Sequence, residues 1–189
     1  MKKTLVFVLT LFTCMAQAAN PFFGTYKTVR QTTPFNKIKN ADYEPAFMKG
    51  IEEQQKEIDA IVNQRSMPTF ENTIVAFDRS GKLLDRVAST FFALLSAESN
   101  DEMMEISQRI QPALSEHSNN ISLNEKLFQR IKFVYDKRDQ LDLNPEEMML
   151  LTRTYQSMAN QGANLEGADR EKYRELSSEL SLSLIHISE

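Results

Sequence analysis

Between positions 69 and 99, apolar and small side chains recur alternately four and three residues apart. The members of this seam are Phe70, Ile74, Phe77, Gly81, Leu84, Ala88, Phe91 and Leu95. The spacing predicts a single helix, begun by Pro68 and the hydroxyl cap of Thr69. Burial of each large member stabilises by roughly 1.5–3 kcal/mol, whereas Gly81 within a helix costs roughly 1 kcal/mol. We therefore expect one helix that continues through Gly81 and packs against other helices.

Other segments carry helix-start signals of well-defined types. The expected starts are Asn40 or Asp42, the capping boxes of Ser99 with Glu102 and of Ser122 with Glu125, the Asn144-Pro145 pair, and Ala168 or Asp169. Apolar residues follow these starts at helical spacing, although Pro112 should kink or end its helix because proline lacks the amide donor. No segment shows the alternation of a strand. The predicted fold class is all-α, an antiparallel array of about six helices joined by short loops.

The first residues form a separate unit that matches a secretory signal peptide. Lys2 and Lys3 precede an apolar run over residues 4–15, and the small residues of Ala16-Gln17-Ala18 follow it. We expect residues 1–18 to be cleaved after Ala18, which places the protein in the periplasm or outside the cell, with no membrane attachment after cleavage. Lipidation of Cys14 is the alternative, and the bulky Phe12 before it argues against that modification.

The composition limits the possible partners. The whole chain has 22 basic and 26 acidic residues, and cleavage after Ala18 would remove two lysines and no acidic residue. An acidic exported chain is not expected to bind nucleic acid, which favours a basic face. Residues 19–40 lack helical periodicity and are rich in Thr, Pro and aromatic residues, so we expect an extended arm whose aromatic side chains dock on the helices of residues 41–181.

The last eight residues, 182–189, depart from the charged, helical sequence pattern of the segment before them. In one reading frame they resemble a translated sequencing adaptor, so we expect this tail to be non-native and the natural protein to continue beyond Ser181. A natural terminus rich in serine and isoleucine is the alternative. A helix would then end in mid-pattern without a cap.

Several segments resemble the thimet oligopeptidase family of zinc metallopeptidases, in the same order along the chain. They are residues 34–38 (PFNKI), 42–47 (DYEPAF), 68–73 (PTFENT), 84–87 (LDRV) with Phe91 and Phe92, 123–128 (LNEKLF) and 173–180 (YRELSSEL). The resemblance extends from about residue 34 to residue 181. It is strongest to the bacterial peptidyl-dipeptidase (dipeptidyl carboxypeptidase) branch, which releases dipeptides from peptide C-termini.

This resemblance implies the amino-terminal part of a helical clamshell with a channel for short peptides. In such enzymes an H-E-x-x-H helix and a later glutamate hold zinc, and the glutamate of the motif acts as general base. The chain has two histidines, His117 and His186, far apart and neither followed by glutamate. Because the family's motif lies beyond the matched part, no catalytic, cofactor-binding or metal-binding residue is assigned, and we expect the fragment to bind no zinc and to be inactive.

A few remaining residues could belong to a site. His117 could sense pH or bind metal, but its polar neighbours predict a solvated side chain. Glu52, Glu53, Glu57 and Asp59 are interpreted as solubility charges. The pairs Met103-Met104 and Met148-Met149 could form a peptide-binding surface, although one member of each pair is expected in the core. Phe92 is expected to pack on a neighbouring helix or on protein outside this segment.

Two functions are consistent with these observations. The first is the exported amino-terminal portion of a zinc peptidase that acts on short peptides. The alternative is a stand-alone secreted helical protein-binding module with Met-rich and aromatic surfaces.

Overall fold

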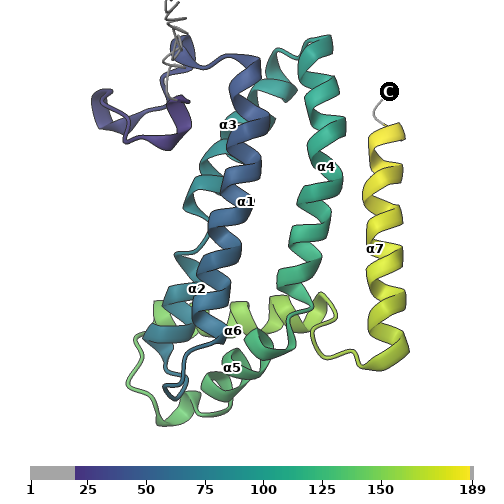
Figure 1. Cartoon of the computed structure of the whole chain (residues 1–189). Coiled ribbons are helices and arrows are strands. Elements are labelled where there is room, and N and C mark those ends of the chain that lie inside the picture. Colours follow the sequence, from purple (N-terminus) through teal and green to yellow (C-terminus); the bar gives the residue numbers. More distant parts are fainter. Residues whose placement is uncertain (1–19, 188–189) are drawn as a thin grey trace, which may run out of the picture.

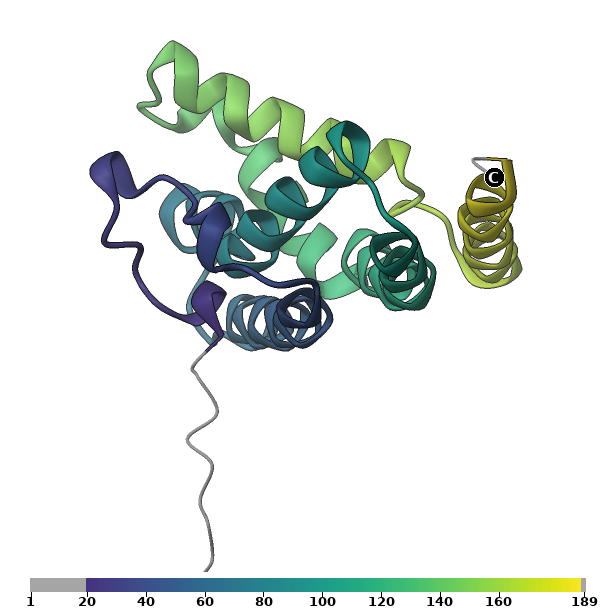
Figure 2. The same cartoon turned by 90° about the horizontal axis from the view of Figure 1, so that it is seen from above.

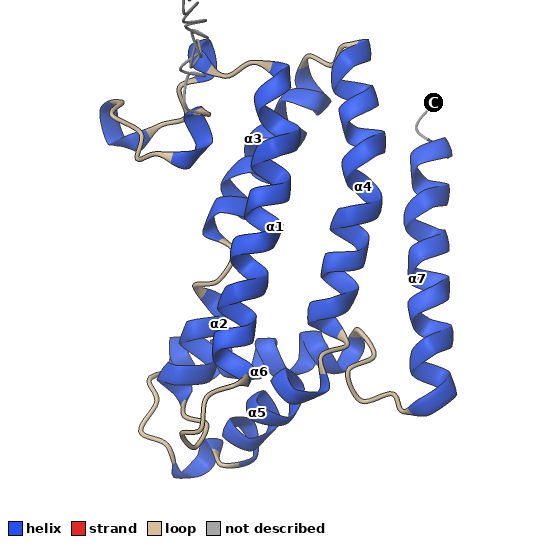
Figure 3. Ribbon diagram, in the orientation of Figure 1, coloured by secondary structure: helices blue, strands red, loops and turns tan. Residues whose placement is uncertain are grey.

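The computed structural model describes residues 20–187, with the side chains of residues 178 and 181–187 left out; the predicted signal peptide, residues 1–18, lies outside it. The helices are α1 (Asn40–Val62), α2 (Ala76–Asp78), α3 (Lys82–Ala97), α4 (Asp101–Ser122), α5 (Glu125–Asp136), α6 (Pro145–Asn160) and α7 (Gly167–Ile187). Shorter helical turns are η1 (Pro21–Phe23), η2 (Val29–Gln31), η3 (Phe35–Lys37), the π-helical η4 (Phe70–Val75) and η5 (Arg138–Gln140). Figure 3 shows no strand over residues 20–187, so the predicted all-α class with six long helices is confirmed.

The long helices are not all antiparallel to their neighbours. In Figure 1, α3 runs opposite to α1 and α7 runs opposite to α4, whereas α1 and α4 run in the same direction. Helices α5 and α6 cross beneath the ends of α1 and α4. Seen from above in Figure 2, α7 stands on the outer side of α4, away from α1 and α3. Helix α4 therefore has a helix on each side.

Helix α1 belongs to two separate cores because its buried residues lie near both of its ends. The aromatic core comprises Phe22, Tyr26, Tyr43, Ala46, Phe47, Val87, Phe91, Met103, Ile106 and Ile110. The aliphatic core comprises Ile58, Ile61, Phe70, Ile74, Leu127, Phe128, Ile131, Val134, Leu151, Met158 and Ala163. In the aromatic core, the ring of Phe91 meets those of Tyr43 and Phe47 edge-on at centroid distances of 4.9 and 5.5 Å, a favoured aromatic geometry.

The close contact of α1 with α3 depends on Gly50. A Cβ atom at Gly50 would lie 2.8 Å from the Cα atom of Leu84, which is closer than backbone and side-chain carbons can approach. The missing side chain at this position therefore sets the distance between the two helices.

The prediction of one continuous helix over residues 69–99 is wrong. The segment is divided into η4, α2 and α3, with a turn at residues 79–81. Gly81 has φ +74°, the left-handed conformation that commonly ends helices and that glycine adopts without a steric penalty. Its N–H donates to Glu57 Oε2 on α1 at 2.7 Å. The hydrogen bond to Glu57 and the left-handed turn favour a break at Gly81 over the continuous helix that the local periodicity predicts. Phe70 and Phe91, on either side of the break, remain buried.

The predicted helix ends are correct to within a few residues. Asn144 caps α6 by accepting from the N–H groups of Glu146 and Glu147, as predicted. The predicted caps Ser99 and Ser122 are replaced by Asn100 and Asn124, which accept from the amides of Met103 and Leu127. Pro112 does not end α4, which continues from Asp101 to Ser122; buried residues on both sides of the proline hold the helix together.

The amino-terminal arm, expected to be extended, contains three short 3-10 turns, η1 to η3, and α1 already begins at Asn40. Phe22 is fully buried against Tyr43, with the ring centroids 5.5 Å apart. The Arg86 guanidinium donates to the carbonyls of Phe22 and Gly24 and lies over the Tyr26 ring. The expected docking of aromatic side chains on the helices is therefore confirmed for Phe22 and Tyr26.

Two polar contacts join the described side chains of α7 to the rest of the fold. Arg174 donates to Asn120 Oδ1 at 2.9 Å, and Arg170 forms an ion pair with Glu125 at 3.4 Å. Leu176 and Leu180 are 55% and 60% exposed. The helix also continues through residues 182–187, so the tail shows no break in the backbone as far as Ile187, and its adaptor origin stays a prediction; residues 188 and 189 lie outside the described part.

Replacing Gly50 by alanine tests the close contact between α1 and α3. Alanine favours helices over glycine, but its methyl group would collide with the Leu84 backbone, so Gly50→Ala should lower the free energy of unfolding by about 1–3 kcal/mol. Urea denaturation measures this change. Gly24→Ala is the matched control, because a Cβ atom there has nothing within 4 Å and the φ is −112°. Equal effects of the two substitutions would contradict the proposed role of Gly50.

Candidate functional site

A cavity of about 580 Å³, the main cavity, lies between α1, α2, α3, α4 and α6. Apolar side chains form much of its wall: Phe77, Leu84, Ala88, Leu114, Ile121 and Met158. Polar side chains also line it: Gln54, His117, Ser118, Ser122, Arg153, Thr154, Ser157 and Gln161. His117 is a titratable side chain in this largely apolar lining.

His117 is buried between α1 and α4, so the prediction of a solvated side chain is wrong. Its exposure is 5%, and its Nε2 lies 2.9 Å from Gln54 Oε1. Because the amide oxygen can only accept, Nε2 carries the proton in this pair. The polar neighbours Glu116 and Ser118 are exposed, since a rotation of about 100° per residue turns them away from the interface. The sequence neighbours of a helical residue are therefore a poor guide to its own burial.

Burial also determines the charge of His117. Desolvation lowers the pKa of the imidazole below its ordinary value, because removal from water disfavours the charged form. The side chain is therefore neutral at pH 7. In addition to the main cavity, it borders a second one of about 500 Å³ between α1 and α4.

Gln54 connects His117 to the turn at Gly81. A Cβ atom at Gly81 would lie 2.3 Å from Gln54 Nε2, so the amide occupies the space that a larger residue would need. One side chain of α1 thus contacts both α4 and the start of α3, and fixes one wall of the main cavity.

The acidic residues of α1 form no paired catalytic carboxylates. Glu52 and Glu53 form ion pairs with Lys56 and Lys49, at the surface as expected for solubility charges. Glu57 instead accepts from the Gly81 amide, a structural contact that the sequence analysis missed.

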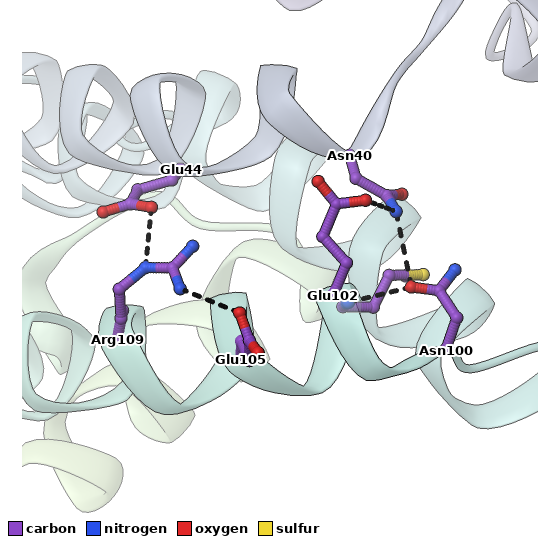
Figure 4. A network of polar contacts seen from close by, with 7 residues as sticks. Asn40, Glu44, Asn100, Glu102, Glu105 and Arg109 are labelled. Carbon is purple, nitrogen blue, oxygen red and sulfur yellow. Dashed lines mark hydrogen bonds and ion pairs between the residues drawn. The ribbon is translucent and has the colours of Figure 1, made fainter.

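A polar network joins the amino-terminal halves of α1 and α4 (Figure 4). Arg109 donates to Glu44 at 3.0 Å and lies 3.8 Å from Glu105. Asn40 Nδ2 donates to Glu102 Oε2 at 2.7 Å and to Asn100 Oδ1 at 3.3 Å. These groups are half-exposed and satisfied by one another, so the network aligns two helices and offers no free acid or base.

Arg130 is a buried residue that the sequence analysis did not single out. It is 9% exposed and donates to the carbonyls of Gln64 and Ser66 and to the side chains of Asn72 and Thr73. Burial lowers its pKa, but a guanidinium remains charged at neutral pH. It ties the loop before η4 to α5, and no local sequence pattern signals such a contact.

The methionine and phenylalanine side chains considered for a site mostly have a packing role. Met103 is 3% exposed, as expected for one member of its pair, while Met149 is 51% exposed. Phe92 contacts the ring of Phe47 on α1 at a centroid distance of 6.1 Å, which confirms that it packs on a neighbouring helix.

Residues 20–187 contain no group of three His, Cys, Asp or Glu side chains that could hold a metal ion. No helix within this range combines the length and the apolar character needed to cross a bilayer.

The buried His117 predicts a pH-dependent stability. The unfolded chain takes up a proton near pH 6.5, whereas folded His117 does so only at lower pH. Its contribution is therefore complete above about pH 6.5 and is lost as the pH falls toward the folded pKa. We expect His117→Gln to lose less unfolding free energy than the native protein between pH 7.5 and 5.5, measured by urea denaturation.

Carboxylates and His186 are common to both proteins, so their contributions cancel in this comparison. Identical pH dependence of the native and His117→Gln proteins would contradict the burial of an uncharged imidazole.

Comparison with known proteins shows that the chain is similar to part of several peptidases. It is 38% identical over 161 residues to the dipeptidyl carboxypeptidase of Escherichia coli K12, a match that covers 85% of this chain and 24% of that protein. The dipeptidyl carboxypeptidase of Salmonella typhimurium is 36% identical over 162 residues, with 86% and 24% covered. A thimet-like oligopeptidase of Dictyostelium discoideum is 22% identical over 157 residues, with 75% and 23% covered.

No protein-family model matches the chain. The chain spans about a quarter of the length of the curated relatives that it matches. The similarity nevertheless extends over most of its residues and includes two dipeptidyl carboxypeptidases. Over most of its residues the chain therefore matches proteins of the thimet oligopeptidase family, among them members of the peptidyl-dipeptidase branch.

Proposed function

We propose that this chain is the amino-terminal helical portion of an exported zinc peptidase that releases dipeptides from the C-termini of short peptides. The 38% identity over 161 residues to a dipeptidyl carboxypeptidase carries this proposal. The more distant similarity to oligopeptidases supports the broader class of peptidase.

The role proposed for this portion is structural. The zinc ligands and the general base would come from an H-E-x-x-H helix in the part of the enzyme beyond the matched region. The rigid pair of α1 and α3, with α4 beside α1, would form one wall of a channel. Such a wall restricts substrates to short peptides, because a folded protein cannot enter a narrow channel.

Export is part of the same proposal. The two lysines, the apolar run of residues 4–15 and the small residues before Ala19 have the order of a cleavable signal peptide. The mature protein would begin two residues before η1, whose first contacts include Asn20 Nδ2 donating to the Asp42 carbonyl at 2.7 Å. We therefore propose a periplasmic or secreted protein that folds after its signal peptide is removed.

A stand-alone secreted binding module is the second candidate. The observation that favours it is the partly apolar cavity of about 580 Å³, which has the size of a ligand site. This candidate predicts a protein that binds a partner but hydrolyses nothing.

A peptidase assay on two proteins separates the candidates. One is the 189-residue chain, and the other is the complete protein from an intact copy of the gene. We expect the complete protein to release a C-terminal dipeptide from a blocked tetrapeptide and to lose activity with EDTA, since zinc would activate the attacking water. Added zinc should restore activity, whereas the 189-residue chain should remain at background.

The same preparation tests export, because protein isolated from the exported fraction should begin at Ala19. Hydrolysis by the 189-residue chain alone, or full activity of the complete protein after metal removal, would refute the peptidase proposal. An intact signal peptide on the exported protein would refute the proposed processing.

A further inference from the structure

The segment of residues 23–39, here called the basic loop, differs in charge from the helices that follow it. It contains Lys27, Arg30, Lys37 and Lys39 but no acidic residue, and all 26 acidic residues of the chain come after it. These four side chains are exposed. None of them forms an ion pair with a side chain that the structure describes. The basic loop is therefore a patch of unpaired positive charge.

Exposed apolar side chains lie between these cations. Val29 is 84% exposed and directly precedes Arg30, and Phe35 is 55% exposed and lies two residues before Lys37. Single exposed apolar residues are normal at a protein surface, but Val29 and Phe35 alternate with unpaired cations on one short segment. The loop thus presents apolar and basic groups together.

Contacts at both ends hold the basic loop to the body of the fold. Near its start, Tyr26 is buried, and the guanidinium of Arg86 lies over its ring and donates to the Gly24 carbonyl. Near its end, Ile38 packs on the aromatic core. Figures 1 and 2 show the segment between them projecting from the start of α1, on the side away from α4 and α7. Val29 and its charged neighbours are therefore presented outside the helices on a fixed base.

The turn around Val29 is stabilised by its own hydrogen bonds rather than by apolar packing. The Thr28 hydroxyl donates to the Thr32 carbonyl, and the Thr32 hydroxyl donates to the Val29 carbonyl at 3.1 Å. Arg30 and Gln31 both have φ +55°, a left-handed conformation that is unfavourable for residues with a side chain. Strained conformations of this kind cluster at binding segments. The turn therefore keeps an apolar side chain exposed at a conformational cost, which favours a function for that exposure.

From these observations we propose that the basic loop docks on the surface of a bilayer that contains anionic phospholipids. The four cations contact the phosphate head groups, while Val29 and Phe35 enter the boundary between the head groups and the acyl chains. Basic residues combined with exposed apolar side chains characterise segments that lie in this interface. Attraction of each cation to an anionic surface adds to the binding. The acidic residues all lie outside the loop, so their repulsion from the same surface favours the orientation in which the loop faces the membrane.

A protein partner, including the part of the enzyme beyond the matched region, fits this surface less well. Three of the four cations are lysines, and lysine is depleted at protein–protein interfaces, which favour arginine. Between Val29 and Phe35 lie Arg, Gln, two Thr and Pro, rather than the aromatic and aliphatic residues that form the core of protein interfaces. A bilayer requires no such core, because each apolar side chain enters it separately.

The inference goes beyond the proposed function, since binding of lipid needs no zinc site. The expectation of no membrane attachment after cleavage rested on the signal peptide and Cys14, neither of which belongs to the basic loop. A peripheral surface of exposed side chains is a different kind of attachment from a spanning helix or a lipid chain.

Sedimentation with lipid vesicles tests the proposal. The protein is the complete product of an intact gene without residues 1–18, because the apolar run in those residues would itself bind lipid. Vesicles of phosphatidylcholine alone are compared with vesicles that contain about one-third phosphatidylglycerol. We expect binding to the anionic vesicles to be tighter by about tenfold or more. This binding should weaken when the salt concentration is raised to about 0.5 M.

Charge substitutions locate the binding to the basic loop. Lys27→Gln together with Arg30→Gln should weaken binding to anionic vesicles by about fivefold for each charge removed. The matched control is Arg79→Gln together with Lys82→Gln, which removes the same charges from two exposed side chains outside the loop. The control should leave binding nearly unchanged.

A second pair of substitutions tests the apolar contribution. Val29→Ser together with Phe35→Ser should weaken binding to anionic vesicles about tenfold. The matched control is Met67→Ser together with Met149→Ser, because these side chains are 67% and 51% exposed and lie outside the loop. All four side chains are exposed, so both variants should fold, which circular dichroism checks.

Equal binding to neutral and anionic vesicles, or equal binding of the native protein and the variant that lacks Lys27 and Arg30, would overturn the proposal. Absence of the protein from the vesicle pellet would overturn it as well. Slow hydrogen exchange of residues 27–37 in the lipid-free complete protein would then identify the rest of the enzyme as the occupant. The peptidase assay contains no lipid. Hydrolysis without vesicle binding therefore refutes only this inference, and vesicle binding without hydrolysis refutes only the proposed function.

Discussion

The close approach of α1 and α3 at Gly50 is the contact on which the other packing depends. The backbone of Leu84 lies where a side chain at position 50 would be, so the two helices meet without intervening atoms. This distance allows Phe91 to reach both Tyr43 and Phe47 above the contact. Below it, the same alignment brings the Gly81 turn onto the side chains of Gln54 and Glu57. The break between α2 and α3 is therefore a consequence of packing against α1.

Helix α4 lies between α1 on its inner side and α7 on its outer side. Its inner side joins α1 through Ile106, Ile110 and the buried His117. On its outer side, Arg174 of α7 donates to Asn120 of α4, and Arg170 of α7 pairs with Glu125 at the start of α5. The residues of α4 that face α3 and α6 line the main cavity. The same geometry explains why the buried, neutral His117 borders a largely apolar cavity.

The sequence predicted those features that depend on local chemistry. The cap at Asn144, the inward seam of Phe70, Ile74 and Phe91, and the docking of Phe22 all follow from residue type and spacing. The predictions for Gly81 and His117 failed because distant residues decide them: Glu57 and Gln54 lie on α1. Arg130 was missed for the same reason, since its carbonyl partners belong to a loop more than sixty residues away in sequence. The similarity to the thimet oligopeptidase family could be inferred because it rests on short motifs in order, which need no tertiary information.

Hydrogen exchange measured by mass spectrometry on the full chain tests most directly whether α1 is the element around which the fold is organised. Helix α1 contributes side chains to both cores, so its amides should exchange only through global unfolding. They should therefore be the slowest to exchange in the protein. Amides of α7, held by exposed polar contacts, should exchange much faster through local opening. Exchange of α7 at the same slow rate as α1, or rapid exchange of α1 around Gly50, would contradict the account.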